Sequence, residues 1–407
     1  MQNYETYTFP SGLRLIHYPV NTPISYCGFA VNVGTRDEKP EHFGIAHFTE
    51  HMLFKGTSKR KSGHIINRME NVGGELNAYT TKEETIIYSI FLEEHFERAF
   101  ELLADLVFNS QFPESEIEKE RDVILDEINS YKDNPSELIF DEFEDLLFEK
   151  HEIGHNILGE PETLENIDKK AFLGFHTSFY RPCNMAFFSM GRIPFKQILR
   201  IANKYLNALN YPASVELKRN SPVKSSGQHK KIDKDLFQNH VMIGSRAYNL
   251  FDKNRVSLFL LNNILGGPGM NSRLNLSLRE KSGLVYNVES NVTSYTDTGV
   301  FSIYFGCDPK FTEKCISLTH KELKKLKEIS LTDAQLSTAK KQLKGQLGIS
   351  NENKENISLS MGKSFLHRNR YDSLEKIYEK IDGISSNHLL EVANEIFDEK
   401  ELSMLIY

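Results

Sequence analysis

The order of strand and helix patterns in the first half of the chain returns in the second half, about 215 residues later. In each half a strand is followed by a helix, then by two adjacent strands and by a run of helices. A repeated order of this kind predicts two homologous domains instead of one continuous core. We therefore expect an α+β fold in which each domain is an antiparallel sheet flanked by helices.

With 407 residues, the chain is too long for one ordinary hydrophobic core. We expect an N-terminal domain over residues 1–210, a linker over 211–234 and a C-terminal domain over 235–407. The linker is predicted because this stretch shows no regular periodicity and combines proline, serine and glycine with many lysines.

Composition excludes several classes of protein. The chain is 39% hydrophobic and 26% charged, as in soluble globular proteins, and its net charge of −7 shows no basic excess for nucleic acid. No run of about 18 apolar residues predicts a membrane span. The first residues lack the pattern of a secretory signal, so a cytoplasmic location is expected. The four cysteines are scattered and are predicted to be free thiols.

The stretch around residues 43–54 has helical periodicity and contains His47, Glu50 and His51. On a helix, residues three and four apart project to nearly the same side, so two imidazoles and one carboxylate share a face. That arrangement is typical of half a zinc site, in the reverse of the commoner order H-E-x-x-H. The alternative is a pair of helix histidines whose polar atoms are satisfied by neighbouring side chains.

A catalytic zinc ion usually has three protein ligands, so a third donor is needed. The helix expected from Pro113 to about Tyr131 carries many acids, most of which should face water. Glu120 and Glu127 are seven residues apart and fall on one stripe beside the apolar face. Either acid could instead be an ordinary exposed residue of a charged helix.

The second copy cannot repeat this set of residues. The five positions are occupied there by residues that are neither histidine nor acid. His47, Glu50 and His51 fall opposite Phe259, Asn262 and Asn263, and Glu120 and Glu127 fall opposite Ala339 and Gln346. Only the N-terminal copy is therefore predicted to carry metal chemistry.

With these residues in view, the chain resembles the pitrilysin and mitochondrial-processing-peptidase family of zinc metallopeptidases, the inverzincins, as a small half-length bacterial type. The resemblance covers nearly the whole chain. It rests on the H-x-x-E-H stretch with Glu127, on GGELNAYT at 73–80, on ER-x-VI at 120–124, and on the segments LGG to SRL (265–274) and LREK-x-GL-x-Y (278–286).

By this resemblance, one Zn²⁺ ion per chain would be bound by His47, His51 and Glu127, and Glu50 would be the general base. The other implied roles are supporting ones: Glu120 would orient a ligand histidine, Asn77 and Ala78 would hold the substrate backbone as an added strand, and Arg279 and Tyr286 would stabilise the substrate or the tetrahedral intermediate. In the alternative interpretation Asn77 favours a turn, Arg279 pairs with a helix acid and Tyr286 is a strand aromatic.

A second stretch, from His151 to His155, fits the order H-E-x-x-H letter for letter. Gly154 lies inside it and Pro161 follows shortly, so we expect it at a helix end or in a loop. There, residues four apart need not share a face, and we reject it as a metal site.

The resemblance implies a zinc-dependent endopeptidase that hydrolyses peptides or short unfolded polypeptides inside a dimeric chamber. Because the chain keeps both the zinc motif and the pair of Arg279 and Tyr286, a homodimer is expected, and a heterodimer with a metal-free homologue is the alternative. A different class of function is a non-catalytic or precursor-specific partner subunit of a heterodimeric processing complex.

Overall fold

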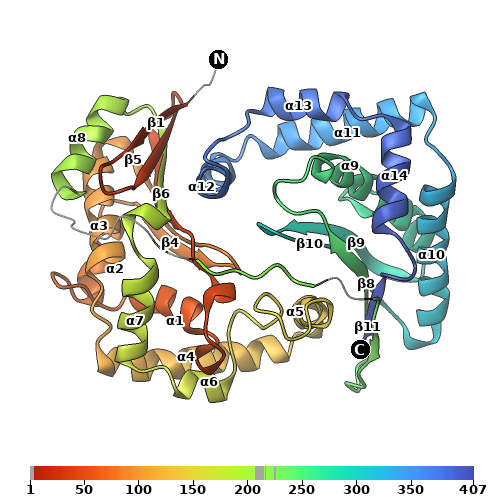
Figure 1. Ribbon diagram of the computed structural model, residues 1–407, viewed down its shortest axis with the longest axis horizontal. Helices are drawn as coiled ribbons and strands as arrows, with labels where there is room; N and C mark the ends of the chain where they lie inside the picture. Colours follow the sequence, from red (N-terminus) through yellow and green to blue (C-terminus); the bar gives the residue numbers. More distant parts are fainter. Residues whose placement is uncertain (1–3, 207–214, 216, 224–225) are drawn as a thin grey trace. The chain divides into compact units, whose positions relative to one another are not determined.

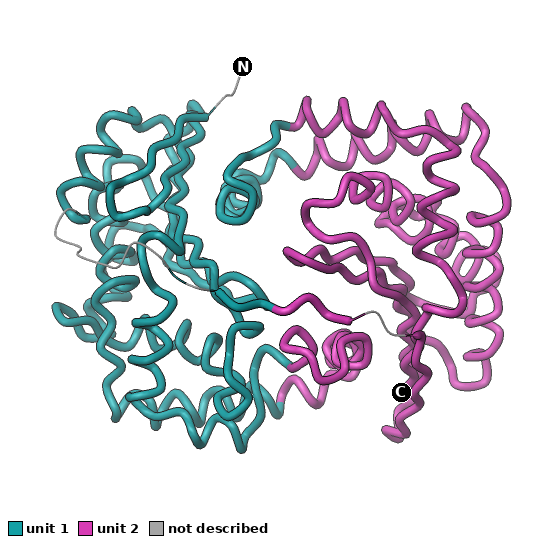
Figure 2. Tube along the Cα trace, in the orientation of Figure 1, with its two compact units in different colours: residues 1–129, 156–219, 351–373 teal, residues 130–155, 220–350, 374–407 magenta. Residues whose placement is uncertain are grey.

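The computed structural model describes residues 4–206, 215, 217–223 and 226–407 and forms two compact units (Figure 2). Unit 1 comprises residues 1–129, 156–219 and 351–373, and unit 2 comprises 130–155, 220–350 and 374–407. Part of the expected linker, at 211–214, 216 and 224–225, lies outside the described residues. The expected domains were continuous segments, whereas each compact unit includes a segment from the other half of the chain. The boundaries of the homologous halves stay a prediction.

The sheet of unit 1 has six strands in the order β1-β2-β6-β3-β5-β4 (Figure 1). Neighbouring strands are antiparallel except β2 and β6, which run parallel. The strands are β1 (Glu5–Thr8), β2 (Arg14–Pro19), β3 (Ile24–Val31), β4 (Glu75–Thr80), β5 (Thr85–Leu92) and β6 (Met185–Gly191). Nearly all residues of the central strands β3, β5 and β6 are buried, which indicates that both faces of the sheet are covered.

One face of this sheet packs against helices that share a core with Phe29, Phe100 and Phe187. These helices are α1 (Ile45–Leu53), α2 (Ser62–Glu70), α3 (Phe96–Asn109), α4 (Glu114–Lys132), α6 (Pro161–Glu165), α7 (Lys169–Phe179) and α8 (Phe195–Leu206). The opposite face is covered by α12 (Lys354–Arg368), whose Met361 and Phe365 join Phe188 in a second cluster.

The sheet of unit 2 has five strands in the order β7-β11-β8-β10-β9. They are β7 (His229–Lys231), β8 (Asn239–Ala247), β9 (Val285–Ser294), β10 (Gly299–Cys307) and β11 (Ser403–Ile406), and β7 and β11 form the parallel pair. Strand β7 lies in the segment that was expected to be an irregular linker, and β11 was not predicted. Both are short strands that exist through their pairing with neighbours.

Helices also cover both faces of the second sheet. On one face, α9 (Arg255–Gly266), α10 (Thr312–Glu328), α11 (Asp333–Ser350) and α14 (Ser386–Ile396) enclose the main core, and α13 (Leu374–Asp382) packs against α9 and α11. On the other face, α5 (Pro135–Leu147) packs against β8 and β11. A short π-helical segment, η5 (Asn275–Glu280), precedes β9.

The two units therefore exchange one helix each. Helix α5 comes from the N-terminal half of the chain and completes unit 2, and α12 comes from the C-terminal half and completes unit 1 (Figure 2). The predicted class, α+β with two sheets flanked by helices, is confirmed, with one parallel strand pair in each otherwise antiparallel sheet. Within the described ranges, no helix has the length and apolar character needed to cross a bilayer.

Candidate metal centre

Helix α1 begins at a glycine that its backbone conformation requires. Gly44 has φ +96°, and a Cβ there would lie 2.7 Å from the carbonyl oxygen of Leu158. The carboxylate of Glu38 accepts hydrogen bonds from the backbone N–H of Gly44 at 2.8 Å and of Ala46 at 2.7 Å. This carboxylate satisfies N–H groups at the helix start and fixes the first turn, in which His47 lies.

His47, His51 and Glu127 converge in unit 1. The Nε2 atoms of both histidines face Oε2 of Glu127, at 3.9 Å from His47 and 3.8 Å from His51. The three residues offer one ligand atom each, and these atoms all lie within 4.8 Å of one another. In the part of the chain that the structure describes, this is the one group of histidines, cysteines and acids with the spacing of a metal site.

The donor set fits a zinc ion. Donor atoms of a tetrahedral zinc ion lie about 3.4 Å apart, so the separations of 3.9 and 3.8 Å from Glu127 are a few tenths of an ångström wider than those of a zinc-bound set. Burial, with a smaller contribution from the neighbouring His51, lowers the pKa of His47 to about 3. His47 is therefore neutral at physiological pH, which is the form of imidazole that binds a metal.

Glu120 holds the imidazole of His51 from the side opposite Glu127. Its Oε1 lies 2.9 Å from Nδ1 of His51, and its Oε2 lies 2.5 Å from Nζ of Lys55. A carboxylate on the second ring nitrogen sets the tautomer and direction of a ligand histidine. Lys55 was not predicted as a site residue, because it lies in the turn after the end of α1, where helical spacing no longer indicates a shared face.

Glu50 is held by a residue from a different element. The hydroxyl of Thr80, at the end of β4, donates to Oε2 of Glu50 at 2.6 Å. Burial raises the pKa of Glu50, and the nearby Glu127 adds to this rise, whereas the bond from Thr80 and the charge of His51 oppose it. A raised pKa suits a general base that works near neutral pH. Thr80 was not predicted as a site residue, because its contact depends on how β4 lies against α1.

Asn77 and Ala78 lie on β4, which is the edge strand of the sheet of unit 1. They pair with Tyr88 and Ile87 of β5 on one side. Asn77 is exposed and Ala78 is half-buried. Strand β4 is also the strand that delivers Thr80 to Glu50, so this edge leads directly to the carboxylate.

Arg279 and Tyr286 lie together in unit 2. The guanidinium carbon of Arg279 is 5.7 Å from the centre of the Tyr286 ring, which is the geometry of a cation–π contact. Arg279 also forms an ion pair with Glu280 at 3.8 Å. The alternative interpretation, in which Arg279 pairs with a helix acid, is therefore compatible with the structure as well. Tyr286 is 85% exposed at the start of the edge strand β9.

The stretch from His151 to His155 is not helical, as predicted, and belongs to an irregular turn of unit 2. His151 there lies 2.9 Å from the carbonyl oxygen of Asn220 and 3.0 Å from Glu152. Both contacts use Nε2 of His151. Among the described residues, His151 belongs to no group with the spacing of a metal site.

Two family models match the chain. Residues 15–161 match the model described as insulinase (peptidase family M16), and residues 166–343 match the model described as the peptidase M16 inactive domain. An uncharacterized zinc protease of Rickettsia bellii is 33% identical over 406 residues, which cover 100% of this chain and 98% of the relative. The uncharacterized zinc protease YmxG of Bacillus subtilis is 30% identical over 402 residues, 98% of this chain and 97% of the relative.

Solved structures share the fold. A protease from Helicobacter pylori superposes with a TM-score of 0.91 at 23% identity, covering 99% of this chain and 98% of that one. A peptidase M16 inactive domain from Pseudomonas fluorescens superposes with a TM-score of 0.92 at 20% identity, covering 99% and 97%.

Proposed function

This chain belongs to the M16 family of peptidases, and we propose that it is a zinc-dependent endopeptidase acting on peptides or short unfolded polypeptides. The observation that carries the proposal is the convergence of His47, His51 and Glu127, whose ligand atoms lie within 4.8 Å of one another. In this proposal the three residues hold one Zn²⁺ ion, and Glu50 on the same helix face is the general base.

A zinc ion bound there would supply a water of lowered pKa and would polarise the scissile carbonyl. Glu50 accepts the proton that the attacking water loses and returns it to the nitrogen of the leaving amine. Thr80 fixes one oxygen of Glu50, so the other oxygen is presented in a constant direction. No covalent bond between the chain and the substrate is needed.

The substrate would lie along β4. An extended peptide can add to an exposed sheet edge through backbone hydrogen bonds, and Asn77 and Ala78 lie on such an edge. Because β4 also carries Thr80, a peptide added there would run toward Glu50.

We assign Arg279 and Tyr286 to the stabilisation of the substrate or of the tetrahedral oxyanion, which both side chains can do by donating hydrogen bonds. Their mutual contact and the 85% exposure of Tyr286 support this role, because an exposed aromatic side chain is available to a ligand. The proposal includes a homodimeric chamber. The cytoplasmic location expected from the sequence also stays a prediction.

A second candidate function is a non-catalytic or precursor-specific partner subunit of a heterodimeric processing complex. The match of residues 166–343 to a domain described as inactive favours it, and so does the replacement of His47 and His51 by Phe259 and Asn263 in the second copy. That replacement concerns the second copy alone. The complete donor set of unit 1 favours the catalytic function.

The experiment is zinc analysis of the purified chain combined with peptide cleavage. We expect about one equivalent of zinc, and the Glu50→Gln variant should keep the zinc but lose cleavage by about 10²- to 10⁴-fold. Glu118→Gln, an exposed acid on α4, is the control and should cleave like the wild type. Less than half an equivalent of zinc together with no cleavage would contradict the proposal that the chain is an endopeptidase.

Peptides that co-purify with Glu50→Gln separate the remaining alternatives. One recurrent sequence would favour a precursor-specific subunit, whereas a mixed pool would favour a general endopeptidase. Gel filtration of wild type and variant at several concentrations tests the homodimer.

A further inference from the structure

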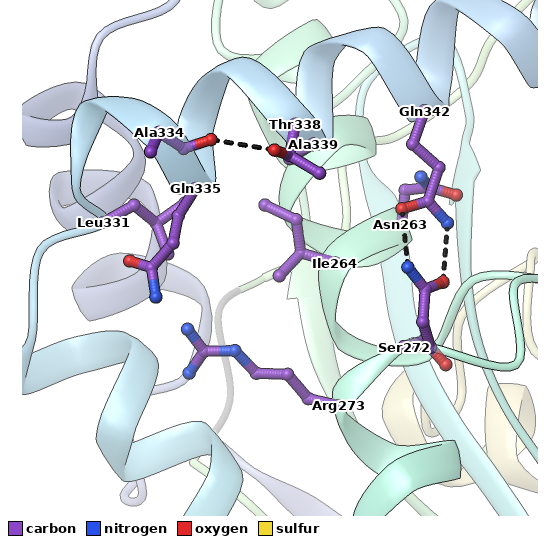
Figure 3. Close-up of a pocket in the computed structure, with 11 residues that line it drawn as sticks. Asn263, Ile264, Ser272, Arg273, Leu331, Ala334, Gln335, Thr338, Ala339 and Gln342 are labelled. Atoms are coloured by element: carbon purple, nitrogen blue, oxygen red, sulfur yellow. Dashed lines mark hydrogen bonds between the residues drawn. The ribbon is translucent and has the colours of Figure 1, made fainter.

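A pocket of about 360 Å³ opens in unit 2 between α9, α11 and the loop that follows α9 (Figure 3). Its wall combines apolar side chains with amides, hydroxyls and one guanidinium. The lining residues are Asn263, Ile264, Asn271, Ser272, Arg273, Leu331, Ala334, Gln335, Thr338, Ala339 and Gln342. The size is that of small-ligand sites in proteins.

Arg273 supplies the one formal charge of the lining. Its guanidinium points into the pocket in Figure 3, and among the described residues it has neither a hydrogen bond nor an ion pair. Burial lowers the pKa of Arg273, and the carboxylate of Glu322 acts on it only from a distance. Glu322 is itself paired with Lys325 at 2.6 Å. The guanidinium is half-buried and has no close partner, so an anion in the pocket would gain a charge-assisted hydrogen bond from it.

Gln335 turns a second donor toward the same space. Its Oε1 accepts a hydrogen bond from the backbone N–H of Thr332 at 2.9 Å, which is part of the N-terminal cap of α11. Because the oxygen is used in this way, the amide NH₂ of Gln335 is the group left to face Arg273 (Figure 3). Two N–H donor groups thus converge from different elements.

The remaining polar groups of the lining are largely occupied. Asn271 and Gln342 exchange amide hydrogen bonds at 3.0 and 3.4 Å, and the hydroxyl of Thr338 donates to the carbonyl oxygen of Ala334 at 2.9 Å. Ser272 accepts from Asn275 at 2.9 Å. Ile264 and Leu331 provide apolar surface beside the two free donors. The pocket therefore offers the guanidinium of Arg273 and the amide N–H groups of Gln335 next to an apolar wall.

We propose that this pocket binds a monovalent carboxylate that carries a short apolar group. Arg273 would take the carboxylate in the forked geometry that guanidinium groups favour, and Gln335 would add a neutral donor. A single positive charge matches a monoanion better than a phosphate dianion, and Ile264 and Leu331 suit an alkyl group. The carboxylate has two sources, a free small acid or the C-terminus of a peptide.

The test uses the full chain, with 4-methylpentanoate and its neutral amide as probes in ligand-observed NMR titrations. We expect the acid to bind at millimolar concentration, which is realistic for so small a ligand, and at least about tenfold more tightly than the amide. Equal affinity of acid and amide, or no binding below about 10 mM of either 4-methylpentanoate or the acid N-acetyl-Ala-Leu, would overturn the proposal.

Three variants locate the binding. Arg273→Gln should weaken the binding of 4-methylpentanoate by about tenfold or more. Gln335→Glu should abolish this binding and still provide an oxygen for the cap of α11. Lys341→Gln removes one charge from an exposed position of α11 outside the pocket and should bind like the wild type. Circular dichroism checks that each variant is folded. Unchanged affinity in folded Arg273→Gln would refute the assignment.

N-acetyl-Ala-Leu and its C-terminal amide distinguish the two sources. Tighter binding of the free peptide acid than of 4-methylpentanoate would identify a peptide terminus as the ligand, and weaker binding would identify a small free acid. In both cases the amide should bind less well than the acid, because Arg273 distinguishes them by charge. None of these measurements depends on peptidase activity.

Discussion

The helix pairs α1/α4 of unit 1 and α9/α11 of unit 2 hold the same places in the repeated order of elements but carry different chemistry. In unit 1 the pair brings together His47, His51 and Glu127, with Glu120 behind His51. In unit 2, Asn263 and Ala339, the counterparts of His51 and Glu120, line a pocket with one unpaired guanidinium. In our two proposals, one scaffold presents either a cation site or an anion site, and the side chains decide which.

The exchanged helices α5 and α12 show a second contrast. Helix α5 is held on its sheet by apolar side chains, among them Ile139 and Phe143, which are fully buried. Helix α12 approaches its sheet at Gly362 and adds charges, because Lys363 and His367 both reach the buried Glu84. The two helices have the same place in the repeat; both bury apolar side chains, and α12 adds charged contacts to a buried acid.

The largest effect is expected where α5 is held. Phe143→Ala should lower the free energy of unfolding by about 3–5 kcal/mol, because a buried ring leaves a cavity. Gly362→Ala in α12 should cost about 1–3 kcal/mol, since its Cβ would lie 2.5 Å from the Phe188 ring. Urea unfolding followed by circular dichroism measures both, as the chain has no tryptophan. A cost below about 1 kcal/mol for Phe143→Ala would contradict apolar retention of α5.

The next effect concerns zinc affinity. Glu127→Gln should weaken zinc binding by about 100-fold, because four ligands of a structural site share roughly 10–16 kcal/mol, or about 3 kcal/mol each. The opposite change in the second copy, Gln346→Glu, should leave the zinc content unchanged, since Phe259 and Asn263 offer no imidazole. Competition with a chromophoric chelator measures both. A higher zinc content in Gln346→Glu would contradict the prediction that the helix pair α9/α11 cannot bind zinc.

A pH dependence is expected from the charged contact of α12. Burial alone would raise the pKa of Glu84, but the hydrogen bond with His367 and the charge of Lys363 outweigh it and lower the pKa from 4.5 to about 2. The folded-state pKa is the lower one, so this contribution is complete above pH 4.5 and disappears as the pH falls from 4.5 to 2. Its size is on the order of 3 kcal/mol.

Glu84→Gln should therefore be less stable than the wild type at neutral pH, and the two unfolding curves should converge near pH 2. Urea midpoints between pH 2 and 6 measure this. Glu118→Gln, which changes an exposed acid, should follow the wild type throughout. If Glu84→Gln keeps the acid sensitivity of the wild type, Glu84 is not its source.

The smallest effects concern the support of His51. Glu120→Gln should weaken zinc binding by about 10- to 100-fold, and Lys55→Gln by up to about tenfold, because Lys55 acts through the carboxylate of Glu120. Lys55→Arg should restore most of the affinity, whereas Lys119→Gln, an exposed change on α4, should have no effect. A loss in Lys55→Gln that Lys55→Arg does not recover would mean that Lys55 acts by packing.

Much of the metal centre could be predicted because its residues lie on two helices. The spacings from His47 to His51 and from Glu120 to Glu127 place side chains on one face wherever a helix forms, and both helices form within one or two residues of the expected bounds. Phe259 and Asn263 in the second copy likewise showed that the donor set occurs once. The roles of His47, His51 and Glu127 in metal binding stay predictions.

The sequence by itself determined the repeated order of elements, the α+β class and the shared faces of the metal-site residues, because local spacing is enough to specify them. Tertiary structure alone decided the exchange of α5 and α12, the contact of Thr80 with Glu50 and the approach of Arg273 to Gln335. Each of these depends on which distant segments pack together. Periodicity along the chain carries no information about such contacts.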